Sequence, residues 1–563
     1  MAEKILSVKN LSIHFTTQLP IVKAVDHVSF DLKQGESLGI VGESGSGKTI
    51  TALSVLGLLP PSASIHSGNI FFYPENNNRI SLTDLSKKEM RAIRGNDIAM
   101  IFQEPMSSLN PVYTCGNQVI ENIKEHKNLS SKQSRALCLD LFEQVKLPVP
   151  LRIFRSYPHQ LSGGQIQRVM IAMAISCNPK ILIADEPTTA LDVTVQQSIL
   201  QLLKELTRQY NMSLIFISHD LGVVSEIADT IAVMNKGQIV EFNSKEKIIH
   251  HPQNIYTKGL LACRPPLSYK PFRLKTLKDF YHPGEENTQV SMETPPGKSG
   301  EILFSLENVS KQFSLKSNFW GKSIHSLEAI KNISLSIHKN ETLGLVGESG
   351  CGKSTLGRLM LKLLNVTEGN IYYKGKKLND LSGKSLRQFR QEVQIIFQDP
   401  YSSINPKPTV EKIIAEPLNY YHYTSSKKET LTKVKEILND VKLEEHFLHR
   451  YPHELSGGQR QRVAVARVLA LRPSFIVCDE SVSALDVSIQ AEILNLLQDL
   501  KEKYQLTYIF ISHDFSVVRF MADKIVVMRQ GKIIEKGASD KIFEAPQNQY
   551  TKILLNSIPG TQP

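Results

Sequence analysis

The sequence lacks the features that mark several common classes of protein. Its six cysteines show no C-x-x-C pair and no paired spacing, which argues against zinc, iron–sulfur and disulfide sites and favours reduced, mostly buried thiols. No uninterrupted apolar run reaches the roughly 18 residues that a membrane span needs. The first residues, MAEKILSVKN, contain no apolar signal-peptide segment. We therefore expect a cytosolic protein.

What is present is an ordinary globular composition with an excess of basic residues. Hydrophobic residues make up 41% and charged residues 21% of the 563 positions. The net charge of +11 suits a polyanionic ligand, a nucleic acid or an anionic membrane surface. Charge alone does not decide among these partners.

The chain contains the same series of motifs twice. The paired segments are GESGSGKT at 42–49 and GESGCGKS at 347–354, LSGGQ at 161–165 and 455–459, Asp-Glu at 185–186 and 479–480, and Ser-His-Asp at 218–220 and 512–514. Because solenoid units repeat every 20–50 residues or so, a period near 300 indicates duplicated domains. The first copy is longer between its glycine loop and Gln103, where residues 74–78 resemble an extended hairpin or loop.

We place the first domain at residues 1–266, a linker at 267–300 and the second domain at 301–563. Four prolines at 271, 283, 295 and 296 interrupt any long helix in the linker. A basic amphipathic turn at 273–280 is conceivable, but a solvated coil spanning roughly 30 Å is the better prediction.

The order of elements indicates an α/β fold. Each copy opens with strand-like alternation, and a buried strand at 38–41 leads directly into the first glycine loop. Polar, helix-patterned stretches at 85–165 and 380–455 precede two more apolar strands in each copy. Strands that alternate with helices predict a parallel-sheet core.

The pattern G-x-x-x-x-G-K-[ST] predicts a phosphate-binding loop between a strand and a helix. Its backbone N–H groups face phosphate oxygens, and its glycines allow the close approach. Lys48 and Lys353 should reach the β- and γ-phosphates of ATP, and Thr49 and Ser354 should offer hydroxyls to Mg²⁺. The loop residues that we assign to nucleotide binding are Gly42, Ser44, Gly45, Ser46, Gly47, Lys48 and Thr49, and Gly347, Ser349, Gly350, Cys351, Gly352, Lys353 and Ser354.

Two adjacent acidic residues end a later apolar strand in each copy. Asp185 and Asp479 stand where a carboxylate could hold a water bound to Mg²⁺. Glu186 and Glu480 stand where they could orient or polarise the attacking water. A tandem ATPase with a catalytic glutamate in each half is the resulting interpretation.

These motifs together resemble the ATP-binding cassette (ABC) family across both halves. The resemblance identifies Q-loop glutamines (Gln103 and Gln398), the LSGGQ signature, ALD loops (with Asp192 and Asp486) and γ-phosphate histidines (His219 and His513). It implies tandem P-loop ATPase domains, each with a parallel-sheet core, an antiparallel β subdomain and a helical subdomain. It also implies that Glu186, Glu480, His219 and His513 are catalytic, and that Mg²⁺ is held by Thr49, Gln103, Asp185, Ser354, Gln398 and Asp479.

In this family each signature faces the phosphate loop of the opposite domain, at a helix N-terminus that favours anions. The resemblance therefore implies two composite sites, with the domains paired within one chain. The signature residues are Ser162, Gly163, Gly164 and Gln165, and Ser456, Gly457, Gly458 and Gln459. Phe15 and Phe313 resemble adenine-stacking aromatics, although either could be a core residue, and Phe319 or Trp320 could substitute in the second domain.

Both copies retain the catalytic glutamate and the glycines of the signature. Ile166 replaces the usual basic residue after LSGGQ, and Ser481 replaces the usual proline after Glu480. Cys351 lies within the second phosphate loop near a helix N-terminus, where thiolates are favoured. We expect alkylation of this thiol to block the second site, and ATP to prevent it.

The nearest resemblance is to fused ATPase subunits of oligopeptide/dipeptide ABC importers. It rests on IFQEPMSSLNP and IFQDPYSSINP, on YPHQLSGGQ and YPHELSGGQ, and on unit ends with Pro-Gln-Asn-x-Tyr-Thr at 252–257 and 546–551. Such a subunit would bind two permease subunits peripherally, on the cytoplasmic face of the inner membrane. It would serve an extracytoplasmic solute-binding protein indirectly, with no nucleic acid. Some relatives carry a cysteine cluster, but Cys263 stands alone here, so we infer none.

Alternatives from another class remain. A soluble ABC ATPase acting on ribosomes or nucleic acid, without a permease, would suit the basic charge, but such proteins have a longer, charged helical linker. A DNA-repair ATPase would need zinc cysteines. The cargo stays open among di- and oligopeptides, glutathione, peptide antibiotics, murein peptides and nickel.

Overall fold

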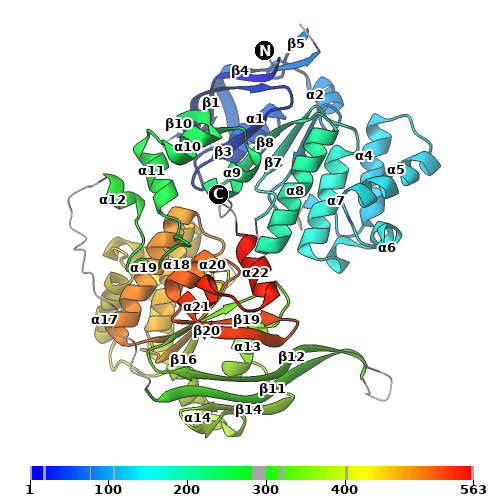
Figure 1. The fold of residues 1–563 in the computed structure, drawn as a ribbon. Coiled ribbons are helices and arrows are strands. Elements are labelled where there is room, and N and C mark those ends of the chain that lie inside the picture. The colour runs from blue at the N-terminus through cyan, green and yellow to red at the C-terminus, as the bar shows by residue number, and fades with distance from the viewer. Residues whose placement is uncertain are drawn as a thin grey trace. The chain divides into compact units, whose positions relative to one another are not determined.

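The computed structural model describes residues 3–16, 21–75, 78–104, 108–189, 191–281, 300–317, 323–399 and 403–558. It divides into two compact units, one built by Met1–Leu261 and the other by Ala262–Thr561 (Figure 1). Both units have the same order of strands in the same two kinds of sheet. The duplication read from the motifs is therefore a duplication of the fold.

The core of the first unit is a six-stranded sheet in the order β10-β9-β3-β8-β7-β6. Its strands are β3 (Ser37–Val41), β6 (Ile98–Ile101), β7 (Ile181–Asp185), β8 (Ser213–Ser218), β9 (Thr230–Asn235) and β10 (Gln238–Ser244). All neighbouring pairs are parallel except β9 and β10. The central strands are short apolar runs with both faces buried, as a parallel sheet between helix layers requires.

A second, antiparallel sheet has the order β2-β1-β4-β5. Its strands are β1 (Lys4–Phe15), β2 (Val22–Lys33), β4 (Ala63–Glu75) and β5 (Asn78–Ser81). β4 and β5 pair as an antiparallel hairpin in which Glu75 faces Asn78, so the extended hairpin predicted near residues 74–78 is present.

In the first unit, the helices between β6 and β7 form a helical subdomain. The helices of the whole unit are α1 (Lys48–Val55), α2 (Lys87–Ile93), α4 (Cys115–His126), α5 (Ser131–Gln144), α6 (Pro150–Arg155), α7 (Gly163–Ile175), α8 (Val193–Gln209), α9 (Leu221–Ile227), α10 (Lys245–His250) and α11 (Ile255–Ala262). Parallel core, antiparallel sheet and helical subdomain together confirm the predicted fold class.

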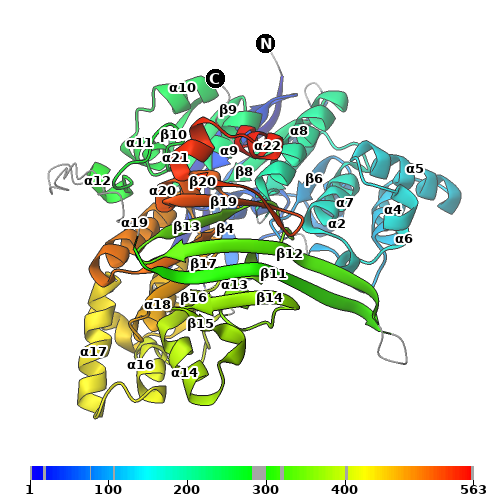
Figure 2. The ribbon, with the colours of Figure 1, turned by 60° about the horizontal axis from the view of Figure 1, so that its bottom comes forward.

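The second unit repeats this plan, and Figure 2 shows its long antiparallel strands side by side. Its strands are β11 (Ile302–Ser317), β12 (Ser323–His338), β13 (Thr342–Val346), β14 (Glu368–Tyr373), β15 (Lys376–Lys377), β16 (Val393–Ile396), β17 (Phe475–Asp479), β18 (Thr507–Ile511), β19 (Lys524–Arg529) and β20 (Lys532–Ala538). Its helices are α13 (Lys353–Met360), α14 (Gly383–Glu392), α16 (Val410–Tyr420), α17 (Lys427–Asp440), α18 (Gly457–Leu469), α19 (Val487–Tyr504), α20 (Phe515–Met521), α21 (Ser539–Glu544) and α22 (Gln549–Asn556).

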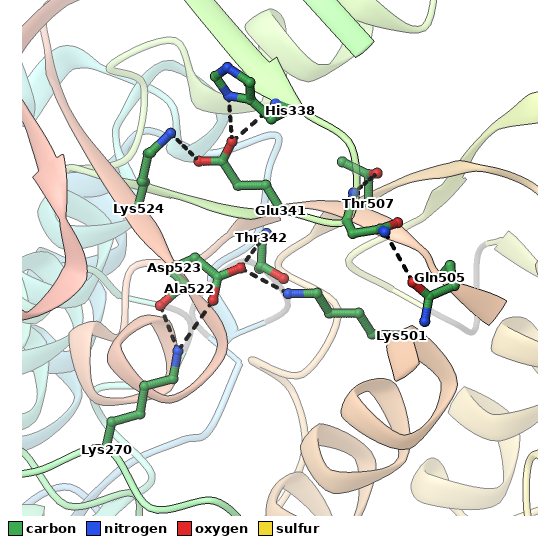
Figure 3. Close-up of polar contacts among 11 residues, drawn as sticks. Lys270, His338, Glu341, Thr342, Lys501, Gln505, Thr507, Ala522, Asp523 and Lys524 are labelled. Carbon is green, nitrogen blue, oxygen red and sulfur yellow. Dashed lines mark hydrogen bonds and ion pairs between the residues drawn. The ribbon is translucent and has the colours of Figure 1, made fainter. Parts of the chain in front are cut away.

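The segment after Leu261 packs on the second unit and includes the short helix α12 (Leu277–Tyr281). The backbone N–H and C=O of Leu274 bond to the side chain of Asn495, at 3.0 and 2.9 Å. Lys270 Nζ donates to the Ala522 carbonyl at 2.8 Å and lies 3.7 Å from Asp523 (Figure 3). The prediction of a solvated coil is therefore wrong for residues 267–281, because partners more than 200 positions away hold the backbone of Leu274 and the side chain of Lys270. Residues 282–299 lie outside the described part.

The cysteines follow the sequence-based expectation. All six lie in the described part of the chain as buried thiols outside any disulfide. Burial raises the pKa of Cys115 to about 11 and that of Cys138 to about 12, which leaves these thiols unreactive at neutral pH. In the described ranges, no helix is long and apolar enough to cross a bilayer.

Candidate active sites

Each phosphate loop joins the central strand of the parallel sheet to a helix. The first runs from β3 to α1 and the second from β13 to α13. Gly47 has φ of 99°, and a Cβ there would lie 2.4 Å from the carbonyl oxygen of Ala24. At Gly352, with φ of 108°, a Cβ would lie 2.6 Å from the Ala329 carbonyl. Only glycine fits both the left-handed backbone and the neighbouring strand.

The loop lysines fold back over their own loops. Lys48 Nζ donates to the carbonyls of Gly42 at 2.7 Å and Glu43 at 2.9 Å, and its side chain is buried. Lys353 Nζ repeats this arrangement with Gly347 at 2.6 Å and Glu348 at 3.0 Å. Each ammonium group therefore lies against two carbonyl oxygens of its own phosphate loop.

The hydroxyl that follows each lysine meets the aspartate of the acidic pair. Thr49 Oγ1 donates to Asp185 Oδ1 at 3.2 Å, and Ser354 Oγ donates to Asp479 Oδ1 at 2.8 Å. Burial raises the pKa of Asp185 to about 6 and also raises that of Asp479. A hydroxyl and a carboxylate in contact, without sulfur or imidazole ligands, fit Mg²⁺, which prefers oxygen ligands.

The glutamate of the acidic pair is the centre of the next group. Glu186 Oε2 accepts hydrogen bonds from Gln103 Nε2 at 3.0 Å and Thr189 Oγ1 at 2.9 Å. His219 Nδ1 lies 3.3 Å from Glu186 Oε1. Burial alone would raise the pKa of Glu186, but the hydrogen bond and charge of His219, with Thr189, lower it to about 2.

The second unit has the same arrangement around Glu480. Gln398 Nε2 donates to Glu480 Oε2 at 2.8 Å, and His513 Nδ1 lies 3.5 Å from that oxygen. Burial opposes ionisation here too, but His513 and Lys353 hold the pKa of Glu480 below its usual value. Each site thus holds an ionised carboxylate beside a histidine, buried at Glu186 and half-buried at Glu480, which can orient or polarise a water molecule.

The signature residues form a separate group at the start of α7 and of α18. Ser162 caps α7: its Oγ accepts from Gln165 N at 3.4 Å while Gln165 Oε1 accepts from Ser162 N at 3.1 Å. Ser456 and Gln459 form the same capping box on α18. Ser162 and Ser456 are exposed, and these capping contacts lie within the helix start.

The signature glycines also have a packing role. A Cβ at Gly164 would lie 2.7 Å from the Val195 side chain, and one at Gly458 would lie 2.4 Å from Ile489. Val195 and Ile489 belong to α8 and α19, so a larger residue would push these helices away. By contrast, a Cβ at Gly163 or Gly457 would make ordinary contacts of 3.5 and 3.6 Å with Leu191 and Leu485.

The two candidate adenine-stacking aromatics occupy matching places. Phe15 ends β1, and Phe313 lies on β11 with the Lys311 ammonium 5.2 Å from its ring centroid. Both are partly exposed, and the strands beside them, β2 and β12, supply the Ala24 and Ala329 carbonyls behind the phosphate loops. Adenine stacking stays a prediction. Phe319 and Trp320 lie outside the described residues.

Sequence reasoning missed several residues of these sites. Thr189 binds Glu186, whereas its counterpart Ser483 donates to the Glu480 carbonyl at 2.9 Å instead. Arg460, which is Ile166 in the first unit, donates to the carbonyls of Pro452, before the signature, and of Leu455, its first residue. The repeated threonine and serine after the acidic pair were a usable signal for the first of these contacts.

The fold and these sites define a protein with two P-loop ATPase cassettes. Family comparison agrees: residues 25–189 and 330–483 match the model described as "ABC transporter". Residues 240–281 and 534–563 match "Oligopeptide/dipeptide transporter, C-terminal region". The chain belongs to the ABC transporter family, as an ATP-binding and ATP-hydrolysing subunit of the oligopeptide/dipeptide type.

Curated relatives are similar over the whole chain. The glutathione import ATP-binding protein GsiA of Pectobacterium atrosepticum is 43% identical over 100% of this chain and 90% of its own length. GsiA of Escherichia coli O157:H7 is 44% identical with the same coverage. The dimeric structure of MJ0796, a bacterial ABC transporter cassette, aligns with a TM-score of 0.38 at 32% identity, over 42% of this chain and 99% of its own.

Proposed function

We propose that this protein energises the import of glutathione or a related small peptide through a membrane permease. The observation that carries the proposal is similarity across the full chain to glutathione import ATP-binding proteins, together with an oligopeptide/dipeptide C-terminal region in both halves. The same C-terminal region favours a transporter over the ribosome-associated alternative, which has no use for it.

Each unit provides its own set of groups for ATP hydrolysis. Lys48 and Lys353 bind the β- and γ-phosphates, Glu186 and Glu480 hold the attacking water, and His219 and His513 contact the γ-phosphate. Mg²⁺, held by Thr49, Gln103 and Asp185 and by Ser354, Gln398 and Asp479, neutralises phosphate charge when it is bound. The support is the contact between each hydroxyl and its aspartate, and the ionised state of both glutamates.

The signature residues complete the proposed sites. Ser162 and Ser456 are exposed at the beginnings of thirteen-residue helices, where backbone N–H groups favour an anion. We infer, from the family and not from the arrangement of the units, that each signature serves the phosphate loop of the other half. The first and second ATP sites then each combine residues from both copies.

A groove in the helical part of the second unit supports a permease partner. It has a volume of about 320 Å³. Its lining includes Phe397, which directly precedes the Q-loop glutamine Gln398, together with Tyr420 and Arg467. Phe397 is 43% and Tyr420 63% exposed, so the groove presents two large aromatic side chains to a partner. We propose that a cytoplasmic helix of a permease subunit binds here and places the protein peripherally on the inner membrane. A solute-binding protein would deliver the cargo outside.

Uptake in a deletion strain tests this function. Cells that lack the gene should lose uptake of radiolabelled glutathione, and the wild-type gene should restore it. A gene with both Glu186→Gln and Glu480→Gln should not restore it, although its protein accumulates normally. Normal glutathione uptake with lost dipeptide uptake would redirect the cargo within the family, and co-purification with ribosomes instead of permease subunits would overturn the proposal.

A further inference from the structure

The last helix of each cassette sends a tyrosine to the phosphate loop of the same unit. Tyr256 lies on α11, and its hydroxyl oxygen accepts a hydrogen bond from the Glu43 backbone N–H at 3.2 Å. Tyr550 lies on α22 and accepts from the Glu348 N–H at 3.3 Å. The side chains are 2% and 5% exposed. The same long-range contact thus occurs twice, across more than 200 residues of chain each time.

The repeated Pro-Gln-Asn-x-Tyr-Thr segment explains how the first tyrosine is placed. The Glu241 carboxylate on β10 accepts from the backbone N–H groups of Gln253 at 2.8 Å and Asn254 at 3.1 Å. Asn254 Oδ1 then accepts from Tyr256 N at 2.8 Å, which fixes the first turn of the helix. The Glu241 carboxylate therefore fixes the turn before α11, and this turn sets the direction of the Tyr256 side chain.

The second unit repeats each of these bonds. Glu535 on β20 accepts from Gln547 N at 2.7 Å and Asn548 N at 3.1 Å, and Asn548 Oδ1 accepts from Tyr550 N at 2.9 Å. Because the two units share these contacts despite many sequence differences, the arrangement is a property of the cassette.

The residue that each tyrosine holds is also the one that holds the loop lysine. The Glu43 N–H bonds to Tyr256, and the Glu43 carbonyl accepts from Lys48 Nζ at 2.9 Å. The tyrosine hydroxyl and the lysine ammonium therefore fix opposite sides of one residue. The Glu43 carbonyl also accepts from the Ser46 N–H at 3.1 Å, so the tyrosine, the lysine and the turn of the loop all meet at this one residue.

We propose that Tyr256 and Tyr550 are positioning residues that hold each phosphate loop in its nucleotide-binding shape. The inference rests on the proposed roles of Lys48 and Lys353 in binding ATP. It also gives the C-terminal region of the oligopeptide/dipeptide type a task in the ATP site of its own unit. Loss of either hydroxyl loosens the loop before nucleotide binds, so binding weakens while the reacting groups stay unchanged.

The test uses the full-length protein with Tyr256→Phe, Tyr550→Phe and both together. Tyr256→Phe removes the bond from the Glu43 N–H and a longer bond that the hydroxyl donates to Glu43 Oε2 at 3.4 Å. Losses of this size predict a KM for MgATP and a Kd for a fluorescent ATP analogue raised about 2- to 10-fold. The kcat should stay within about twofold of wild type, since Glu186 and Glu480 are unchanged.

Tyr508→Phe is the matched control. Its buried hydroxyl on β18 donates to the Leu497 carbonyl at 3.0 Å, outside the phosphate loop. This variant should lower thermal stability and leave KM unchanged. If the double Tyr256/Tyr550 variant behaves in the same way, with lower stability but wild-type KM and Kd, the positioning role is overturned.

Lys48→Ala and Lys353→Ala distinguish a failure of the tyrosine inference from a failure of the proposed ATP sites. If the double lysine variant loses nucleotide binding and the tyrosine variants bind normally, only the present inference fails. If the double lysine variant binds MgATP like wild type, the proposed ATP sites themselves are wrong, and the tyrosine inference is overturned with them.

Discussion

Gln103 donates a hydrogen bond from its side-chain amide to the carboxylate of Glu186 at 3.0 Å. Gln103 lies just after β6, where the chain passes into the helical subdomain, and Glu186 lies directly after β7. The contact therefore links the helical subdomain to the group that we assign to the attacking water. The second unit has the same link between Gln398 and Glu480, at 2.8 Å. A movement of the Q-loop that withdraws the amide would leave Glu186 Oε2, which Thr189 still contacts, with one acceptor position for water.

Replacing either glutamate should strongly reduce ATP turnover. Glu186→Gln and Glu480→Gln keep the shape of the side chain but remove the charge that His219 and His513 stabilise. We expect each single variant to lose about 100-fold or more of the activity of its own site, the range for a lost general base. Single-turnover hydrolysis measures this loss. Glu205→Gln, an exposed glutamate on α8, is the control, and wild-type hydrolysis in either single variant would sink the two-site model.

Asp185→Asn should raise the stability of the nucleotide-free protein and at the same time weaken its response to MgATP. Because burial raises the pKa of Asp185 to about 6, above its usual 3.8, the unfolded state ionises first. The contribution of the Asp185 carboxyl to the free energy of unfolding is therefore fully present below about pH 3.8 and is lost as pH rises to about 6. At pH 7 the variant should be more stable than wild type without nucleotide, by on the order of 1–3 kcal/mol.

The same Asp185→Asn variant should lose the additional stabilisation that MgATP gives the wild-type protein. Asn keeps an oxygen that can accept from Thr49 but lacks the charge that suits a divalent cation. Thermal unfolding with ATP, with and without Mg²⁺, measures both effects. Asp479→Asn should change stability in the same direction. A variant that is less stable without nucleotide would contradict the burial argument.

The cysteine in the second phosphate loop offers a separate probe. Cys351 is 5% exposed, and its sulfur accepts from Lys353 Nζ at 3.9 Å. N-ethylmaleimide should inactivate the second site, with ATP protecting it, because the added group would fill the space for phosphate. Cys351→Ser restores the residue found in the first loop, Ser46, and should keep activity while removing the sensitivity. Equal inactivation of the serine variant would assign the effect to another thiol.

Local sequence patterns were sufficient for the elements that carry the glycine loops and acidic pairs. The strand before each loop is an apolar run, and each loop has glycines at positions that require positive φ, as at Gly47. The antiparallel and helical subdomains came from the family resemblance. Thr49 and Asp185 meet because β3, which leads into the glycine loop, and β7 are parallel strands of one sheet and end at the same edge. The strand pattern was therefore enough to place the two motifs together.

Other contacts could not be read from local sequence. Tyr256 reaches Glu43 only because β10 and the turn after α10 set the direction of α11. The prolines of the connecting segment correctly excluded a long helix, but its docking depends on Asn495 and Arg519, which lie on α19 and α20. Side chains on distant helices decide whether such a segment is solvated, and no periodicity in the segment reports on them.

The docking of the connecting segment leads to a stability prediction. Asn495→Ala removes both hydrogen bonds to Leu274 and leaves a buried N–H and C=O without their partner. An unpaired buried polar group costs about 1–3 kcal/mol, so the segment should open more often. Trypsin at low concentration should then cut after Arg273 or Lys275 faster than in wild type, as followed by mass spectrometry. Gln201→Ala, at the matching place on α8, alters an exposed amide and should not change this cleavage. Equal cleavage rates in the Asn495 variant and wild type would show that Lys270, Arg273 and Arg519 hold the segment without it.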